Sequence, residues 1–141
     1  MKIERQILYQ IIQEMPTMPP EIGGIIGGKD DIATVYAVDK GKGSRGCCYR
    51  PDINILNSII DRWEVEQYTF MGIFHVHFYG CETISRGDRE YIEIIMQTMP
   101  KRVNSLFFPI VVQPQEKMIP YYAYRTINDK IIIRRDELII L

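Results

Sequence analysis

Residues 72–88 read GIFHVHFYGCETISRGD and contain both histidines of the chain, His75 and His77. The apolar residues before them predict a buried strand. Residues two apart in a strand point to the same face, so the two imidazoles project side by side and suit two ligands of one zinc ion. Seven residues separate His77 from Ser85, and two more separate Ser85 from Asp88, a candidate third ligand. Three protein ligands leave a position for water, as in catalytic zinc sites.

Ser85 and Asp88 also fit an ordinary helix start. Ser85 would be the N-cap, and Asp88 at N3 would complete a short reciprocal cap that complements the helix dipole. The two interpretations are compatible, because a helix start is a rigid place from which to aim a carboxylate. Histidines on a strand also occur as packed or surface residues, so this stretch alone leaves the metal site open.

A second segment, residues 20–28 (PEIGGIIGG), places Glu21 ahead of a glycine-rich run. Together the two stretches resemble the JAMM (MPN+) metallopeptidases, zinc isopeptidases that include deubiquitinases and their prokaryotic JAB-domain relatives. The family pattern is a Glu, a Gly-Gly-apolar-apolar-x-Gly run, His-x-His, and then a Ser and an Asp at the spacing seen here. The last glycine is off the usual spacing, and Phe78 stands where the family usually has proline. Phe78 is not a ligand position, so this departure concerns the shape of the following loop.

The resemblance implies an α/β MPN fold with a curved mixed β-sheet flanked by helices, and Zn²⁺ held by His75, His77 and Asp88. It implies that Glu21 is the general base and that Ser85 stabilises the oxyanion. The implied reaction is hydrolysis of the amide bond after the C-terminal glycine of a ubiquitin-like protein, by deconjugation or precursor processing. Activating and conjugating enzymes (E1- and E2-like) of the same pathway are implied partners.

Composition sets the outer bounds. The 141 residues predict one domain, spanning 1–141, with enough chain for a hydrophobic core. The net charge of −1 gives no reason to expect nucleic acid or an anionic membrane as partner. No apolar run approaches a membrane span, and the N-terminus lacks a signal-peptide core, so we expect a cytoplasmic protein. Cys47, Cys48 and Cys81 form no CxxC pair, which fits a reducing compartment.

Periodicity predicts three helices, at residues 4–15, 51–66 and 85–99, with Trp63 in the core. Besides the histidine strand, we expect strands at residues 21–28, 33–39, 105–113, 118–125 and 130–141, the last two paired as a hairpin around residues 126–129. The tyrosines at 121, 122 and 124 are assigned to sheet packing. Glycines weaken a strand unless a backbone or ligand must come close, so Gly23 and Gly24 are expected to border a peptide cleft.

Residues 40–48 (KGKGSRGCC) lack the spacing of a phosphate-binding loop and do not open a helix directly. We expect a hairpin or a loop at the substrate's edge. Cys47 and Cys48 have no histidine nearby in sequence and are expected to be bystander thiols. Cys81 is a conceivable fourth zinc ligand, but it would close the position that catalysis needs, and we do not favour it.

Two other functions compete with the peptidase. A catalytically silent MPN-type binding or scaffold module ranks second, since such modules usually lack the histidine and aspartate ligands that are present here. A zinc deaminase would need His-x-Glu and Pro-Cys-x-x-Cys, and neither occurs in the chain. Within the peptidase hypothesis the substrate need not be ubiquitin-like, because prokaryotic relatives also cut other amides.

Overall fold

A computed structural model describes residues 1–42 and 49–141, so Cys47, Cys48 and most of the 40–48 loop lie outside the described residues. The described helices are α1 (Arg5–Glu14), α2 (Ile53–Val65) and α3 (Arg86–Thr98). The described strands are β1 (Lys2–Ile3), β2 (Gly23–Lys29), β3 (Ile32–Asp39), β4 (Thr69–Phe78), β5 (Ser105–Phe107), β6 (Ile110–Gln113), β7 (Lys117–Ile119), β8 (Tyr121–Arg125), β9 (Ile131–Arg135) and β10 (Ile139–Ile140). The longest of these helices have 13 residues, and none has the length and hydrophobicity needed to span a bilayer.

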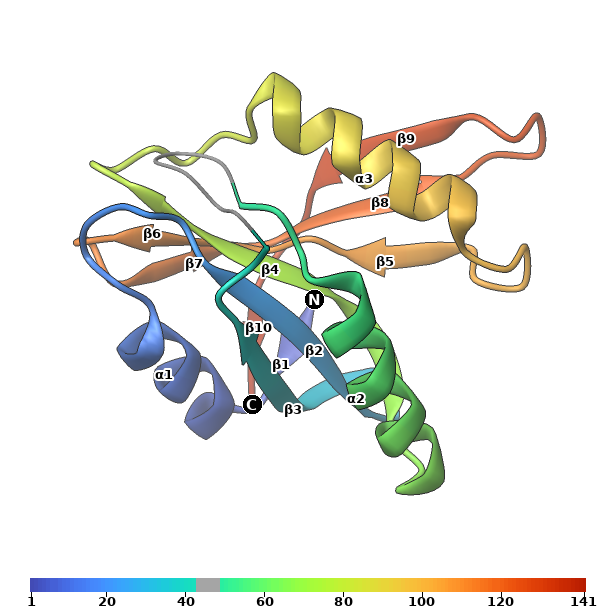
Figure 1. The fold of residues 1–141 in the computed structure, drawn as a ribbon, viewed down its shortest axis with the longest axis horizontal. Coiled ribbons are helices and arrows are strands. Elements are labelled where there is room, and N and C mark those ends of the chain that lie inside the picture. The colour runs from blue at the N-terminus through green and yellow to red at the C-terminus, as the bar shows by residue number, and fades with distance from the viewer. Residues whose placement is uncertain (43–48) are drawn as a thin grey trace.

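The strands form one mixed sheet in the order β10-β1-β3-β2-β4-β5-β8-β9, with β6 and β7 joined to it through β4 (Figure 1). β2 lies antiparallel between β3 and β4, and β4 pairs in parallel with β5 and β6. The sheet is strongly twisted, and β4 crosses it diagonally. The predicted α/β fold, a curved mixed sheet with three helices around it, is confirmed.

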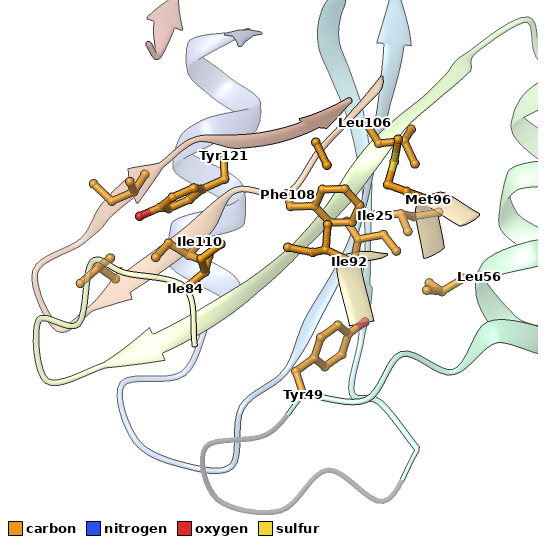
Figure 2. Close-up of a cluster of buried hydrophobic side chains, with 14 of the residues drawn as sticks. Ile25, Tyr49, Leu56, Ile84, Ile92, Met96, Leu106, Phe108, Ile110 and Tyr121 are labelled. Atoms are coloured by element: carbon orange, nitrogen blue, oxygen red, sulfur yellow. The ribbon is translucent and has the colours of Figure 1, made fainter. Parts of the chain in front are cut away.

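Helices cover both faces of the sheet, and each face has its own hydrophobic core. Side chains of α2 and α3 pack with Ile25 on one face, whereas those of α1 pack with Ile26 on the other. Figure 2 shows the first core, where Ile92 and Met96 of α3 approach Ile25. Trp63 belongs to this core, as predicted. Because both faces of β2 are covered, residues 23–28 are all buried and read as one run without polar side chains.

The two strands predicted at residues 105–113 and 118–125 have the expected extent, but each is interrupted. Each break contains a proline, Pro109 in the first and Pro120 in the second, and proline has no N–H to donate to a ladder. The register continues across the first break, since Gly72 pairs with Phe107 and His75 with Ile110. The prolines therefore interrupt hydrogen bonding without redirecting the strands.

The final strand predicted at residues 130–141 is only partly right. Its first half, β9, pairs with β8 in the predicted hairpin. The chain then leaves the hairpin at residues 136–138, where the Asp136 carboxylate binds the amino group of Met1. Its end, β10, pairs with β1 at the opposite edge of the sheet. β1 was not predicted, because two residues are too few to show a strand period.

β4 pairs with β5 at Gly72, where a Cβ atom would lie 1.9 Å from the carbonyl oxygen of Phe107. We predict that Gly72→Ala forces the strands apart and lowers the free energy of unfolding by about 1–3 kcal/mol. Urea denaturation measures this loss. Gly87→Ala is the control, because a Cβ there has only the Ser85 hydroxyl, at 3.8 Å, as a neighbour. Equal stability of the two variants would contradict the prediction.

Candidate metal centre

β4 places both histidines on the face of the sheet that α3 covers. Ile73 packs in the core with α3, whereas Val76 packs in the core with α1. His75 and His77 alternate with Val76 and therefore share the α3 face, as predicted. Their side chains are buried, with exposed fractions of 0% and 5%. β4 thus directs two imidazoles toward α3.

α3 begins with the predicted reciprocal cap. The Ser85 hydroxyl accepts the N–H of Asp88 at 3.0 Å, and the Asp88 carboxylate accepts the N–H of Ser85 at 2.8 Å. Two donors that a helix start leaves unpaired are thereby satisfied. Asp88 is nonetheless buried, because its carboxylate faces the two histidines of β4. One side chain therefore caps the helix and points at the imidazoles.

The three donor groups converge on a small volume. The Nε2 atoms of His75 and His77 are 2.8 Å apart, and they lie 3.3 and 3.1 Å from the carboxylate oxygens of Asp88. Ligands at zinc distances of about 2.0–2.2 Å in a tetrahedron are roughly 3.3 Å from one another. Two imidazole nitrogens and a carboxylate oxygen are also a donor set that zinc accepts. His75, His77 and Asp88 could therefore hold a metal ion.

Burial and neighbouring charges determine which side chains of this cluster are protonated. Burial lowers the pKa of His75, and the opposing hydrogen bond to Asp88 does not overcome it. Burial also acts to lower the pKa of His77, but the hydrogen bond and charge of Asp88 outweigh it and raise that pKa to about 9. Burial acts to raise the pKa of Asp88, but its hydrogen bonds to the two histidines hold it well below its ordinary range. At neutral pH the metal-free cluster is a His77 cation, a neutral His75 and an Asp88 anion.

Glu21 lies just before β2, beside the same cluster. Gly23 pairs with His75, and the N–H of Val76 reaches the carbonyl of Ile22 at 3.0 Å, so the next residue back runs alongside His77. The Glu21 side chain is buried, and the N–H of Tyr49 donates to its Oε2 at 3.1 Å. Burial is the main cause that raises its pKa, to about 7, with the Asp88 charge adding to the rise and the His77 charge opposing it.

Sequence reasoning missed two residues that support Glu21, namely Asp39 and Tyr49. The buried Asp39 carboxylate accepts the Tyr49 hydroxyl at 2.8 Å and the backbone N–H groups of Asp52 and Gly41 at 2.9 and 3.0 Å. The Tyr49 ring stacks on His75, with centroids 6.1 Å apart and planes 12° from parallel. The sequence around Asp39 and around Tyr49 gives no sign of this role, because the network joins segments that meet only in the fold.

Tyr49 is also one of the close neighbours of the glycines of β2. A Cβ atom on Gly23 would lie 2.8 Å from the Tyr49 ring and 2.2 Å from the carbonyl oxygen of Phe74. On Gly24 it would meet the carbonyl oxygen of Ala37 at 2.1 Å. These glycines admit the protein's own neighbouring strands and side chains, which accounts for them, and the border with a peptide cleft stays a prediction.

Cys81 is not part of the three-residue group. It is exposed and free, and its thiol bonds within its own loop to the carbonyl of Thr83 at 3.6 Å. The metal-ligating group found among residues 1–42 and 49–141 consists of His75, His77 and Asp88. Cys81 therefore lies outside the group that could hold a metal ion.

The chain was compared with family models, with curated proteins and with solved structures. No family model and no curated protein matches it. AF2198, a JAB1/MPN domain protein from Archaeoglobus fulgidus, aligns over 100% of this chain and 99% of its own, with a TM-score of 0.54 and 16% identity. The chain has an MPN-type fold. The protein DSY2949 from Desulfitobacterium hafniense is also similar, with a TM-score of 0.68, 16% identity and coverage of 99% of this chain and 92% of its own. Likeness at this identity establishes the fold, and the chemistry must be argued from the site.

The raised pKa of His77 makes metal binding pH-dependent. A metal ion needs the Nε2 lone pair, so below a pKa of about 9 each binding event expels one proton from His77. We predict that the apparent zinc affinity rises about tenfold between pH 7 and pH 8. Competition with a chromophoric chelator, corrected for the chelator's own protonation, measures this change. An affinity independent of pH across this range would contradict the protonated His77.

Proposed function

We propose that this MPN-type chain is a zinc-dependent peptidase that hydrolyses the amide bond after the C-terminal glycine of a ubiquitin-like protein. The observation that carries the proposal is the convergence of His75, His77 and Asp88 with a buried carboxylate, Glu21, beside them. A cytoplasmic location and E1- and E2-like pathway partners belong to the same proposal and derive from the JAMM resemblance alone.

Zinc held by His75, His77 and Asp88 would supply a water of lowered pKa and a positive charge next to the scissile carbonyl. Glu21 takes the proton from the attacking water and later delivers it to the leaving amine. A carboxylate whose pKa is about 7 suits both tasks, because it is a competent base and a competent acid at neutral pH. The Tyr49 N–H fixes Oε2 of Glu21, so Oε1 is the oxygen that carries the proton.

Ser85 has the position and chemistry of an oxyanion donor. Its hydroxyl oxygen accepts the N–H of Asp88, so its hydrogen is left to donate elsewhere. The residue is exposed at the start of α3, next to the ligand carboxylate. A hydrogen bond from Ser85 to the carbonyl oxygen would strengthen as negative charge develops there during attack.

A cleft of about 520 Å³ leads to the site and supports a peptide substrate. Residues 49–51 form one wall, and α3 from its N-cap to Ile94 forms the other. Asp88 and Tyr91 line this cleft, so a chain lying in it passes the candidate metal centre. A tail that ends in glycine carries little side-chain bulk, so its last carbonyl can approach Asp88 within this cleft.

The first prediction separates metal binding from proton transfer. Glu21→Gln keeps the size of the side chain but cannot take a proton, so it should retain zinc and lose cleavage by at least about a hundredfold. His77→Ala should lose both zinc and cleavage. Mass spectrometry of the metal and cleavage of ubiquitin-like fusions measure the two properties, with the exposed Glu93→Gln as the control. An active Glu21→Gln enzyme would remove Glu21 as the base, and a wild type without zinc or cleavage would favour the silent binding module.

A second prediction concerns the two tasks of Ser85. Ser85→Ala removes the helix cap and the donor together, so it should cost about 1 kcal/mol of stability and lower kcat by about 10²–10³. Ser85→Thr keeps a hydroxyl and should retain most of both. Thermal unfolding and steady-state kinetics measure these effects on zinc-loaded protein. A Ser85→Ala enzyme that loses stability but keeps kcat would leave Ser85 with the cap alone.

A further inference from the structure

α3 brings a second polar side chain to the candidate metal centre. Tyr91 follows Asp88 by three residues and so lies on the same face of the helix. Its hydroxyl is 3.3 Å from Nδ1 of His75, on the side of the ring opposite the other donors. Its ring lies edge-on to the His75 ring, with centroids 6.0 Å apart, and edge-on to the Phe108 ring, with centroids 6.2 Å apart. The buried Phe108 therefore holds the tyrosine in place, and the tyrosine faces the histidine.

The distances assign the protons along this chain of contacts. His75 turns Nε2 toward His77 and Asp88, so Nε2 is the atom that a metal would use. A metal needs the lone pair on that atom, and the ring proton must then reside on Nδ1. The nearest acceptor that the structure gives for this proton is the oxygen of Tyr91.

The contacts of the two Nε2 atoms show how closely the candidate ligands are held together. The two Nε2 atoms are 2.8 Å apart, so only one of them can carry a hydrogen between them. Each Nε2 atom also has an Asp88 oxygen nearby, at 3.1 Å from His77 and 3.3 Å from His75. The Tyr91 hydroxyl lies 3.3 Å from Nδ1 of His75, so it can accept the ring proton there once Nε2 is taken by a metal. The tyrosine is therefore already in place beside the candidate ligand.

We infer that Tyr91 is a positioning residue that sets His75 as an Nε2 ligand and thereby raises the affinity of this site for its metal. This inference rests on the proposed metal site but not on peptidase activity. Partners of this kind typically contribute 10–100-fold to metal affinity, so roughly that loss is expected when the hydroxyl is removed. Nδ1 of His77, in contrast, is buried without a hydrogen bond to the described residues. Tyr91 therefore faces Nδ1 of one histidine of the pair, whereas Nδ1 of the other has no such partner among the described residues.

Tyr49, the other tyrosine beside His75, does not share this role. Its ring stacks on the imidazole, but its hydroxyl donates to Asp39. Stacking limits how far the His75 ring can tilt, yet it leaves the choice between the two tautomers open. The selection therefore depends on one oxygen atom, that of Tyr91.

Tyr91→Phe tests the inference, because it removes that oxygen and keeps the ring against Phe108. The zinc dissociation constant, measured by chelator competition at fixed pH on the full chain, should rise 10–100-fold. The absorption spectrum of the cobalt-loaded protein should change, since the ligand field depends on how His75 is oriented. Tyr9→Phe, on the exposed face of α1, is the matched control and should keep the wild-type dissociation constant.

Phe108→Leu separates packing from hydrogen bonding. It loosens the contact with the Tyr91 ring but keeps the hydroxyl, so it should lower stability more than it lowers zinc affinity. The inference is overturned if Tyr91→Phe binds zinc within twofold of wild type, if Phe108→Leu weakens zinc binding as much as Tyr91→Phe does, or if the wild type binds no zinc. A tyrosine-dependent zinc affinity in a protein that cleaves no peptide would support the inference and reject the peptidase.

Discussion

The carboxylate of Asp88 is the group on which the site depends. It accepts the backbone N–H of Ser85 and lies within 3.3 Å of both histidine Nε2 atoms. A helix start and a strand from different parts of the chain are thereby tied through one buried side chain. A buried carboxylate without partners would cost several kcal/mol, so burial is tolerable only while the cap and the histidines are both in place. Correct docking of α3 on β4 and formation of the ligand cluster are consequently one event.

The sheet contributes a second constraint, which is the spacing between neighbouring strands. β2 lies between β3 and β4 and brings the backbone before Gly23 alongside His77. The bare Cα of Gly23 lets the Tyr49 ring lie over the strand, and that ring position carries a backbone N–H to Glu21. Gly23 thus affects the candidate base Glu21 indirectly, through Tyr49. The space at Gly23 allows Tyr49, which follows β3, to lie where its backbone N–H holds the Glu21 carboxylate and its ring stacks on His75.

Local signals predicted much of this arrangement. The period of two in β4 fixed the common face of His75 and His77, and the Ser85–Asp88 spacing fixed the cap, because both depend only on neighbours in sequence. The strands around Pro109 and Pro120 were predicted, but their interruptions were not. A proline interrupts a ladder where its missing N–H would have bonded to the neighbouring strand, and the sequence alone does not identify that strand. Asp39, Tyr49 and Tyr91 could not be predicted, because their partners lie on other elements and no spacing rule connects them. The placement of β10 beside β1 failed for the same reason.

The cluster also explains how a site for a cation can be stable without one. Asp88 is ionised in a buried setting, and in the metal-free protein the proton on His77 supplies the compensating positive charge. Binding of a divalent metal would replace that proton at nearly the same place, between Nε2 of His77 and the carboxylate. Tyr91 already lies beside Nδ1 on the far side of the His75 ring, where it can accept the ring proton when Nε2 binds the metal. Metal binding is therefore an exchange of the His77 proton for a metal ion among side chains that are already positioned. How firmly these side chains are held sets the metal affinity, and pH sets how strongly protons compete with the metal.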